Sequence, residues 1–578
     1  MLTRLEMRNF KRFDQVEVPL ADPVVLIGPN NSGKTTALQA LALWEIGVRS
    51  WFAKHSDKNP GEEIPAKRSG ATIYRRDLLA APVPSAELLW RDLHVRRRSG
   101  PKSTENIRIE IIVDGVTDDA EWSCGLEFDY ANAESFYVRP IANLNENRRQ
   151  IPAEAGLEKV AFLPPMSGLA DREYLRQPGE IGVLIGQGRT AEILRNLCHS
   201  ICQDGRNAGK WREIVHAVRT LFGVELSEPE YFPERGEITM QYLENNTKLD
   251  LSCSGRGLQQ SLLLLAYLFA NPGAVLLLDE PDAHLEILRQ REIYRLLSDT
   301  AAKLRSQLII ASHSEVVLNE AADGGSVVAF VGRPHLLGSG ERGGQVMKAL
   351  KDIRWEDFYN AETKGWVLYL ENATDLAVLQ AFAEKLDHAE AREVLRRPFV
   401  HYVETNLPNK AREHFFGLKE AKDDLVGIAL FDRLDKKIQS GGGLNETTWT
   451  RREIENYFTT EKVLMAYAKG AGSVDDILEF ANSNNRVEIM KSCILEMSSA
   501  FKTMKKSSPW SEDIKASDDF LDPLFANYSE KLKIRLVLRK GEYHRLVRFM
   551  HKDDVPAEVS EKLDAIVVVA KAARPRTE

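Results

Sequence analysis

The first thirty residues distribute apolar side chains in a way that predicts three strands. Residues 2–7 predict an edge strand, and residues 15–20 predict a second strand in which apolar and polar positions alternate. Residues 24–27 form a continuous apolar run, as in a strand buried on both faces, and this run leads directly into Gly28. The chain is therefore expected to begin with a sheet, and the third strand to end at a glycine-containing turn.

The middle of the chain mixes strands with helices. Residues 107–130 alternate like strands, whereas residues 189–223 repeat their apolar positions with a helical period. Residues 275–278 and 308–310 are short, continuously apolar runs that predict two more buried strands. This order predicts an α/β domain with several buried strands.

A second α/β pattern begins after a glycine-rich segment. Residues 338–344 carry four glycines and no large apolar side chain, which predicts a linker. Residues 439–446 predict a flexible loop within the second part. We therefore divide the chain into two domains, residues 1–345 and residues 346–578. In the second domain strands are expected at 367–370, 399–403 and 426–431, and a helix at 376–386.

Composition and charge exclude several classes of protein. The 578 residues are 43% hydrophobic and 28% charged, which is typical of folded rather than disordered chains. The net charge of −8 excludes a uniformly basic DNA-coating protein, but it permits a local basic groove such as residues 91–102. Apolar runs stay below the ~18 residues that a membrane helix needs. The five scattered cysteines favour a reducing compartment. We therefore expect a cytoplasmic protein without a membrane partner.

Residues 28–35 have the spacing of a phosphate-binding P-loop. They read Gly-Pro-Asn-Asn-Ser-Gly-Lys-Thr and lie between a buried strand and a helical pattern, as that loop requires. Glycines let backbone N–H groups wrap the phosphates, and the helix N-terminus adds partial positive charge. We expect Lys34 to reach the β- and γ-phosphates of ATP and Thr35 to ligate Mg²⁺. The expected nucleotide contacts are Asn30, Asn31, Ser32, Gly33, Lys34, Thr35 and Thr36.

Acidic and polar residues after later strands complete a predicted ATP-hydrolysing site. Asp279 ends an apolar strand and is expected to lie near Mg²⁺, which leaves Glu280 to polarise the attacking water. His313 ends another strand and is expected to sense the γ-phosphate. Ser254 and Gly255 precede a helix, and their small side chains let the backbone approach a second phosphate group closely.

These motifs, in this order, resemble the ABC-type ATPases of the SMC class and the related double-strand-break repair ATPases. The resemblance covers residues 1–35 and 250–330. It implies that Ser254 of one head acts on ATP held by another head, so that hydrolysis requires a head-to-head dimer or a higher homo-oligomer. Residues 40–250 lack the long heptad run of a coiled-coil arm. We expect a compact helical insertion at about 150–250 instead, as a candidate dimerisation region.

Carboxylates also follow two predicted strands of the second domain. Glu371 ends one strand and Asp375 starts the helix after it, while Asp432 and Asp435 follow another strand. Two strand ends that carry carboxylates can hold one or two Mg²⁺ ions, with Mn²⁺ or Ca²⁺ as alternatives. Two metals can activate water for phosphodiester cleavage. The same acids are also compatible with solvated strand ends that bind no metal.

Two later stretches add charged residues to this picture. Glu453 and Glu455 lie beside Arg451 and Arg452 in the sequence. Lys540 precedes a glycine, and a lysine there is suited to neutralise a scissile phosphate. Each stretch alone is compatible with an ordinary charged surface. The two stretches support a metal-dependent site only in combination with the strand-end acids.

In combination, these features resemble the Toprim domain of the OLD (overcoming lysogenisation defect) family. Members fuse an ABC-type ATPase to a C-terminal Toprim nuclease, and they include the ATPase-nuclease subunit of Gabija-type anti-phage systems and some retron effectors. The resemblance implies a Toprim-like domain with a C-terminal helical part, a Mg²⁺-dependent DNA endonuclease and a role in anti-phage defence. It also implies a second defence protein or a retron nucleic acid as partner. It implies metal ligands among Glu371, Asp375, Asp432, Asp435, Glu453 and Glu455, catalytic roles for Glu371 and Asp432, and a phosphate contact at Lys540.

Two departures from the family pattern keep other readings open. Asn372 stands where the family usually has a glycine for a tight turn, and asparagine is the next most tolerant residue for a positive φ. Two residues rather than one separate Asp432 from Asp435, so Asp435 faces elsewhere unless the strand has already ended. Three readings remain: an ATP-gated DNA nuclease, an ATPase sensor or scaffold that controls a partner effector, and a DNA-repair ATPase.

Overall fold

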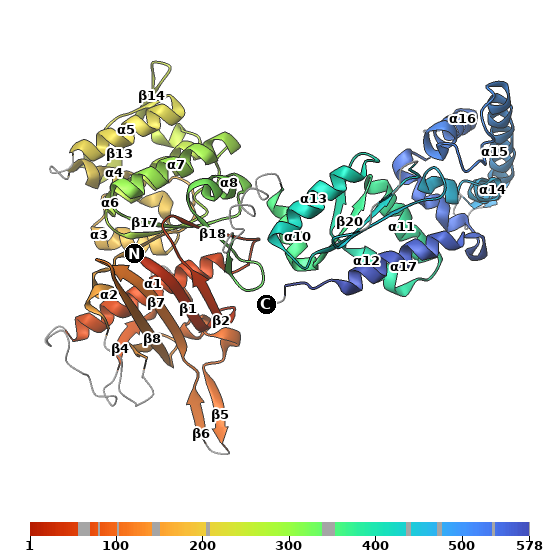
Figure 1. Cartoon of the computed structure of the whole chain (residues 1–578). Helices are drawn as coiled ribbons and strands as arrows, with labels where there is room; N and C mark the ends of the chain where they lie inside the picture. The colour runs from red at the N-terminus through yellow and green to blue at the C-terminus, as the bar shows by residue number, and fades with distance from the viewer. Residues whose placement is uncertain are drawn as a thin grey trace. The chain divides into compact units, whose positions relative to one another are not determined.

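The computed structural model divides the chain into two compact units, residues 1–343 (unit 1) and residues 344–577 (unit 2) (Figure 1). The linker predicted at 338–344 and the boundary near residue 345 lie outside the described residues. None of the helices in the described part of the chain combines the length and apolar character needed to cross a bilayer. The described residues are 1–55, 70–78, 81–100, 103–141, 151–203, 208–337, 353–434, 438, 441–470, 477–533 and 538–576.

The first sheet of unit 1 is antiparallel. Its strands are β1 (Leu2–Phe10), β2 (Phe13–Pro19), β4 (Ala71–Tyr74), β7 (Ile109–Thr117), β8 (Ala120–Asn132) and β9 (Ser135–Pro140). They follow the order β2-β1-β7-β8-β9-β4. The start of the chain was expected to be an edge strand, and this was wrong, because β7 pairs with the open side of β1.

The second sheet of unit 1 carries the predicted buried strands. It contains β3 (Val24–Ile27), β10 (Val160–Leu163), β16 (Val275–Asp279), β17 (Gln307–Ser312), β18 (Ser326–Ala329) and β19 (His335–Leu336). The order is β10-β16-β17-β3-β18-β19, and all pairs are parallel except β18 with β19. All residues of β3, β16 and β17 are buried, as their apolar runs predict. The carboxyl ends of these three strands consequently lie at one edge of the sheet.

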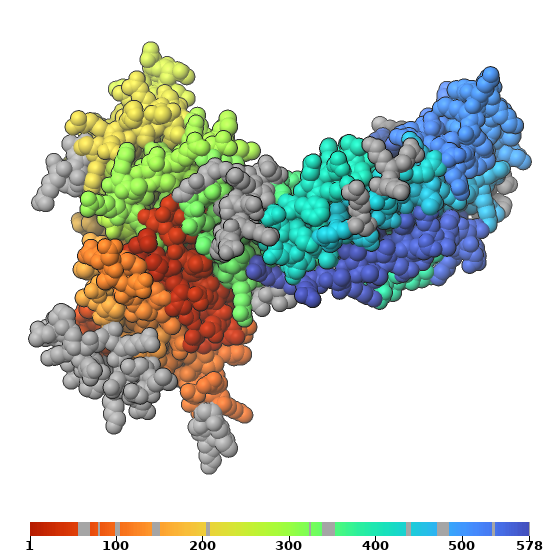
Figure 2. All heavy atoms as spheres, viewed as in Figure 1, coloured from red at the N-terminus to blue at the C-terminus, as the bar shows by residue number. Residues whose placement is uncertain are grey.

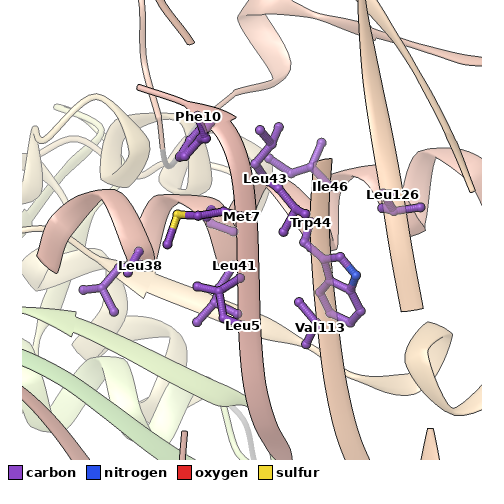
Figure 3. Packing of buried hydrophobic residues seen from close by; sticks show 14 of the residues in the cluster. Leu5, Met7, Phe10, Leu38, Leu41, Leu43, Trp44, Ile46, Val113 and Leu126 are labelled. Atoms are coloured by element: carbon purple, nitrogen blue, oxygen red, sulfur yellow. The ribbon is translucent and has the colours of Figure 1, made fainter. Parts of the chain in front are cut away.

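Helix α1 (Lys34–Lys54) packs against both sheets of unit 1 and fills the core between them. Figure 3 shows Leu38 and Leu41 of this helix beside Leu5 of β1, and Trp44 beside Val113 of β7. The indole Nε1 of Trp44 donates to the Cys124 carbonyl at 3.1 Å, which satisfies the only polar atom of that buried ring. This packing fixes the helix whose N-terminus forms the end of the P-loop.

The stretch from 150 to 250 is more mixed than the helical insertion that its sequence suggests. It does contain helices, but β10 belongs to the main parallel sheet, and five short strands form two small sheets. The short strands are β11 (Glu225–Leu226), β12 (Glu230–Phe232), β13 (Glu237–Thr239), β14 (Gln241–Glu244) and β15 (Thr247–Asp250). The helices of unit 1 after α1 are α2 (Ala153–Leu157), α3 (Pro178–Gly186), α4 (Leu194–Gln203), α5 (Ala208–Phe222), α6 (Arg256–Ala270), α7 (Ile287–Lys303) and α8 (Glu315–Gly324).

The basic run at 91–102 forms part of a hairpin that stands away from the rest of unit 1 (Figure 2). Its strands are β5 (Arg96–Gly100) and β6 (Ser103–Asn106). Arg96, Arg97 and Arg98 are exposed on β5, while Lys102 lies outside the described residues. Arg97 pairs with Glu105 across the hairpin at 3.0 Å, so the local charge is less positive than the run alone suggests.

Unit 2 is built on a parallel four-stranded sheet with the order β21-β20-β22-β23. The strands are β20 (Trp366–Leu370), β21 (Val400–Tyr402), β22 (Val426–Phe431) and β23 (Leu444–Thr448). The first three coincide with predicted strands. The expectation of a flexible loop at 439–446 was wrong over its last residues, because Leu444 is buried and begins β23 beside Gly427 of β22.

Helices cover this sheet and continue into a C-terminal helical part, whose apolar residues join those of β20 and β22 in one core. Helix α11 follows β20 directly, as the sequence predicts. The helices of unit 2 are α10 (Trp355–Lys364), α11 (Ala373–Lys385), α12 (Ala389–Arg396), α13 (Pro408–Ala421), α14 (Glu461–Gly470), α15 (Ile477–Thr503), α16 (Asp522–Leu532) and α17 (Ala557–Ala572).

Candidate functional site

The P-loop joins β3 to α1 and requires a glycine at its last position. Gly33 is the N-cap of α1 and has a φ of 103°, a conformation that residues with a Cβ rarely adopt. A Cβ on Gly33 would also lie 2.2 Å from Cζ of Phe13, whose ring comes from the start of β2. The first sheet therefore packs directly onto the phosphate loop and holds its shape.

Lys34 and Thr35 occupy the positions expected of phosphate and metal contacts. Lys34 is buried, and its Nζ donates to the carbonyls of Gly28 and Pro29 at 2.7 and 2.9 Å. Burial lowers the pKa of Lys34, although the charges of Glu280 and Asp279 oppose this. The ammonium group thus lies within the loop that would surround the terminal phosphates.

The oxygen atoms of Thr35 and Asp279 fit a magnesium ion. Thr35 Oγ1 donates to Asp279 Oδ1 at 3.2 Å. Neighbouring ligands of an octahedral Mg²⁺, each at about 2.1 Å from the ion, are about 3 Å apart. Burial raises the pKa of Asp279 to about 6, and the hydrogen bond from Thr35 opposes the rise. A dication bound here would favour the ionised carboxylate, so this pair is suited to hold Mg²⁺ beside the phosphates.

A pocket of 660 Å³, which we call the nucleotide pocket, opens in front of the P-loop. Its size is within the usual range for a small-molecule site. Lys11 and Arg12, from the turn between β1 and β2, also line it, and sequence reasoning did not assign them to the site. Lys11 Nζ donates to Gln39 Oε1 at 2.5 Å. Positive charge in a turn that precedes the phosphate loop was the signal that could have identified them. The other lining residues are Asn30, Asn31, Ser32, Gly33, Lys34, Thr35, Thr36 and Glu280.

Glu280 faces the nucleotide pocket from a strained backbone conformation. Its φ of 49° is in the left-handed region, which is uncommon for a residue with a side chain and clusters at functional sites. The amide of Glu280 donates to the Ala311 carbonyl at 2.8 Å, which ties this turn to β17. His313 Nδ1 lies 3.5 Å from Glu280 Oε1. His313 therefore contacts the candidate water-activating acid, although it is not itself among the residues that line the pocket.

Ser254 and Gly255 lie away from the P-loop. Neither is among the described residues that line the nucleotide pocket. Ser254 Oγ donates to the Leu251 carbonyl at 2.6 Å, and Gly255 is the N-cap of α6. A Cβ on Gly255 would meet nothing within 4 Å, so space is open in front of this helix N-terminus. A phosphate contact from these residues would thus reach a nucleotide other than the one held by the P-loop of the same chain.

Unit 2 brings five of the predicted acids together. Glu371 follows β20 and Asp432 follows β22, and the two strands are neighbours in the parallel sheet. Two more acids come from a short helical turn, η6 (Ile454–Tyr457), that follows β23. Asp435 lies outside the described residues. We call Glu371, Asp375, Asp432, Glu453 and Glu455 the carboxylate cluster.

The charges of the carboxylate cluster act strongly on one another. Burial, together with the charges of Asp375, Glu453 and Glu371, raises the pKa of Asp432 to about 8. Burial also raises the pKa of Glu455 well above its usual value, and Glu453 adds to the effect. Carboxylates in this situation repel one another when ionised, and a bound dication removes that repulsion. The donor set of carboxylate oxygens fits a hard ion such as Mg²⁺ or Mn²⁺.

The turn that carries Glu371 is fixed by Asp375. Asp375 Oδ2 accepts from the amides of Glu371 and Asn372 at 3.1 and 3.3 Å, and Asn372 Oδ1 accepts from the Thr374 amide at 3.0 Å. Burial raises the pKa of Asp375 to about 6. The expectation that Asn372 replaces a glycine in a left-handed turn was wrong. Its φ is −154°, because it caps helix α11 from an extended conformation.

Lysine side chains border the carboxylate cluster. Lys540 forms an ion pair with Asp518. Burial acts to lower the pKa of Lys540, but Asp518 and the charge of Glu453 act in the opposite direction, and the pKa is raised on balance. The charge of Lys515 lowers the pKa of Asp432, so this lysine also faces the cluster. Sequence reasoning found Lys540 but not Lys515. Nothing in the sequence around Lys515 resembles the motif that identified Lys540, because the structure alone brings the two segments together.

Comparisons with known proteins agree with the nucleotide site. Residues 1–45 match the family described as "AAA ATPase domain", and residues 203–319 match "AAA domain, putative AbiEii toxin, Type IV TA system". One curated relative is the OLD nuclease of Thermus scotoductus, 42% identical over 43 residues. That alignment covers 7% of this chain and 8% of the nuclease, so the chain matches only a small part of its relative.

Solved structures similar to the chain include SMC head domains. The head domain from Thermotoga maritima has 16% sequence identity and a TM-score of 0.29, over 58% of this chain and 97% of that one. The Pyrococcus furiosus head, bound to the C-terminal domain of ScpA, has 14% identity and a TM-score of 0.32, over 58% and 96%. The sequence matches, together with the P-loop and the acids that end β16, make unit 1 similar to AAA-type ATPases, and a short segment of the chain is similar to an OLD nuclease.

Proposed function

We propose that the chain couples ATP hydrolysis in unit 1 to divalent-metal-dependent cleavage of DNA by a Toprim-like site in unit 2. The observation that carries the nuclease part is the carboxylate cluster at the carboxyl end of a parallel sheet, where open α/β sheets place their sites. Unit 1 would bind and hydrolyse the nucleotide, because Glu280 lines the nucleotide pocket and would polarise the water that attacks ATP.

The carboxylate cluster offers the ligands that phosphodiester cleavage requires. Glu371 and Asp432 come from neighbouring strands, so they can share one Mg²⁺ or Mn²⁺ ion. Glu455 belongs to η6 and is buried. A bound dication supplies Lewis acidity to a phosphate oxygen and lowers the pKa of its water. The protein contributes the position of these carboxylates, and Asp375 contributes by fixing the turn before α11.

Lys540 and Lys515 would supply the positive charge that a scissile phosphate needs. Both lysines also lie beside the Asp518 carboxylate, with which Lys540 forms an ion pair and from which Lys515 Nζ is 3.8 Å away. Because Lys540 is paired with Asp518, a phosphate must compete with that carboxylate for the ammonium group. This competition favours a slow or conditional nuclease over a constitutive one.

The same ion pair favours a second candidate function. If Asp518 keeps Lys540 occupied and Asp375 serves only to cap α11, unit 2 could hold a metal without cutting DNA. Unit 2 would then act as a scaffold that controls a partner effector in response to ATP. Both candidates share unit 1 as the ATPase, and they differ only in the chemistry of the carboxylate cluster.

The hairpin of β5 and β6 supports DNA as a partner of unit 1. Its exposed arginines project from the unit and could contact a phosphate backbone. Replacing Arg96, Arg97 and Arg98 by glutamine should reduce the slope of log affinity against log salt concentration by about two to three. An unaltered slope would remove the hairpin from the DNA-binding surface.

Anti-phage defence, a cytoplasmic location and assembly into a homo-oligomer complete the proposal. They are drawn from the OLD resemblance and from the position of Ser254 and Gly255, because space is open beside Gly255 and neither residue lines the nucleotide pocket. A second defence protein or a retron nucleic acid would be the trigger. Loss of phage resistance in cells that carry the Glu371→Ala variant would support the defence role, and unchanged resistance would oppose it.

Plasmid nicking tests the nuclease proposal. The full chain, with ATP and either Mg²⁺ or Mn²⁺, should convert supercoiled plasmid to the nicked form, and Glu371→Ala should abolish this while ATP hydrolysis continues. Glu420→Ala, which removes an exposed acid of helix α13 in the same unit, is the matched control and should nick normally. If the wild-type protein cuts no DNA under any of these conditions while it hydrolyses ATP, the scaffold function replaces the nuclease.

A further inference from the structure

A histidine pair and an aspartate meet on the face of the unit 2 sheet that α10 and α13 cover. Asp357 comes from α10, His401 from β21 and His414 from α13. One ligand atom from each lies within 4.8 Å of the others. We call these three residues the His-His-Asp cluster. They contribute to neither the nucleotide pocket nor the carboxylate cluster.

The distances in the His-His-Asp cluster match those between ligands of one metal ion. Asp357 Oδ2 lies 3.3 Å from His414 Nε2 and 3.6 Å from His401 Nδ1. Ligands held at about 2.1 Å in a tetrahedral zinc site are about 3.4 Å apart. The two imidazole rings lie with their centroids 3.6 Å apart and their planes 20° apart, so both nitrogens reach the same carboxylate oxygen.

The hydrogen-bond partners of the two histidines differ in a way that suits metal binding. His414 Nδ1 lies 2.9 Å from the hydroxyl of buried Tyr369, which fixes the ring and leaves Nε2 directed at Asp357. Metal-bound histidines usually have such a partner on the second ring nitrogen. His401 Nδ1 is buried and makes no hydrogen bond within the described part of the chain. A buried nitrogen without a partner is costly, and an ion would satisfy it.

The guanidinium group of Arg354 lies beside the carboxylate of the His-His-Asp cluster. Arg354 Nε lies 3.4 Å from Asp357 Oδ2, but the arginine side chain is 66% exposed and can move into solvent. The three ligands come from three different elements, so a bound ion would tie α10 to the edge strand β21 and to α13.

We propose that Asp357, His401 and His414 form a site for a borderline transition-metal dication, with Zn²⁺ as the best fit, that is separate from the Mg²⁺-type sites. Two imidazoles and one carboxylate are ligands that zinc prefers, whereas Mg²⁺ and Ca²⁺ prefer oxygen ligands alone. The site stabilises unit 2 by joining α10, β21 and α13. It does not depend on the nuclease proposal, because it shares no residue with the carboxylate cluster.

Equilibrium dialysis of the full chain against micromolar Zn²⁺, with millimolar Mg²⁺ present to occupy the oxygen-only sites, tests the proposal. Wild type should retain one more equivalent of Zn²⁺ than His401→Gln or His414→Gln, and Zn²⁺ should raise its melting temperature. His551→Gln, which removes an exposed histidine elsewhere in unit 2, should bind zinc like wild type. Equal zinc content in wild type and in both cluster variants would overturn the site.

Two measurements keep the test decisive if a glutamine variant folds poorly. Co²⁺ added to wild type should give the intense visible absorption of a tetrahedral nitrogen and oxygen site, and a weak octahedral spectrum would overturn the proposal. Tyr369→Phe removes only the hydroxyl that orients His414 and should weaken zinc binding about 10- to 100-fold. Unchanged affinity in Tyr369→Phe would contradict the assigned orientation of His414, and with it the site.

Discussion

Replacing Asp432 by asparagine should stabilise unit 2 in the absence of metal, although the same change should destroy its proposed activity. Asp432 lies among four other acids and has a pKa raised to about 8 by burial and by their charges. Asparagine has nearly the same shape and carries no charge. It therefore removes the repulsion within the carboxylate cluster without leaving a large cavity.

The size of the effect follows from the pKa of Asp432. Its ordinary value is 3.8, and the folded protein raises it to about 8. At pH 7 the shift costs the folded state about 4 kcal/mol, at about 1.4 kcal/mol for each pH unit between the ordinary value and pH 7. The other carboxylates share this cost because they titrate together, so we expect Asp432→Asn to gain about 2–4 kcal/mol.

The pH dependence has a definite sign. Because folding raises the pKa of Asp432, its contribution to stability is fully present below about pH 4 and is lost as the pH rises through about 8. Metal-free wild type should therefore lose stability in unit 2 between pH 5 and pH 8. Asp432→Asn should lose less over the same interval, and Mg²⁺ should restore stability to wild type but not to the variant.

Hydrogen exchange of the amides of β20 and β22 measures the opening free energy of unit 2 alone. Wild type and Asp432→Asn are compared in EDTA and in Mg²⁺, at pH values corrected for intrinsic exchange. Asp553→Asn, which neutralises an exposed aspartate of the same unit, is the matched control and should leave the opening free energy unchanged. Faster exchange in Asp432→Asn than in wild type, in EDTA at pH 7, would refute the reasoning.

Three further predictions concern unit 1. Lys34→Ala should weaken ATP binding by about 100-fold or more, because it removes the buried cation of the P-loop, and isothermal titration with Lys54→Ala as control would measure this. Glu280→Gln should keep ATP affinity and lose turnover, which a phosphate-release assay beside a binding titration would detect; turnover at the wild-type rate would exclude Glu280 as the water-activating group. Gly33→Ala should destabilise unit 1 by about 3 kcal/mol or more, because its Cβ would meet Phe13 in a left-handed backbone, and an unchanged melting temperature would contradict that geometry.

Features that depend on residues close together in the sequence, such as buried strands and the P-loop turn, could be predicted from the sequence. The apolar run of β3 and the spacing of the P-loop predict both a buried strand and a turn, and the structure contains them together. The strands of unit 2 predicted at 367–370 and 426–431 were identified in the same way, so Glu371 and Asp432 could each be placed at a strand end. Their roles as metal ligands remain a prediction.

Features that depend on distant partners could not be predicted. The edge or interior position of β1 depends on β7, about a hundred residues later. The sequence of strand β23 is polar and resembles a loop. One of its residues, Glu446, is nevertheless buried, and its carboxylate pairs with the guanidinium of Arg412 from α13, which offsets the cost of burying the charge. Lys515 likewise reaches the carboxylate cluster only through folding.

Anomalous scattering from Mn²⁺ in crystals of the full chain with a bound nucleotide tests the two-site proposal most directly. The ion between Thr35 and Asp279 serves as the internal control for metal loading. We predict a second peak in contact with the carboxylates of Glu371 and Asp432. A peak in the nucleotide pocket without one at the carboxylate cluster would contradict the proposal that unit 2 holds a catalytic metal.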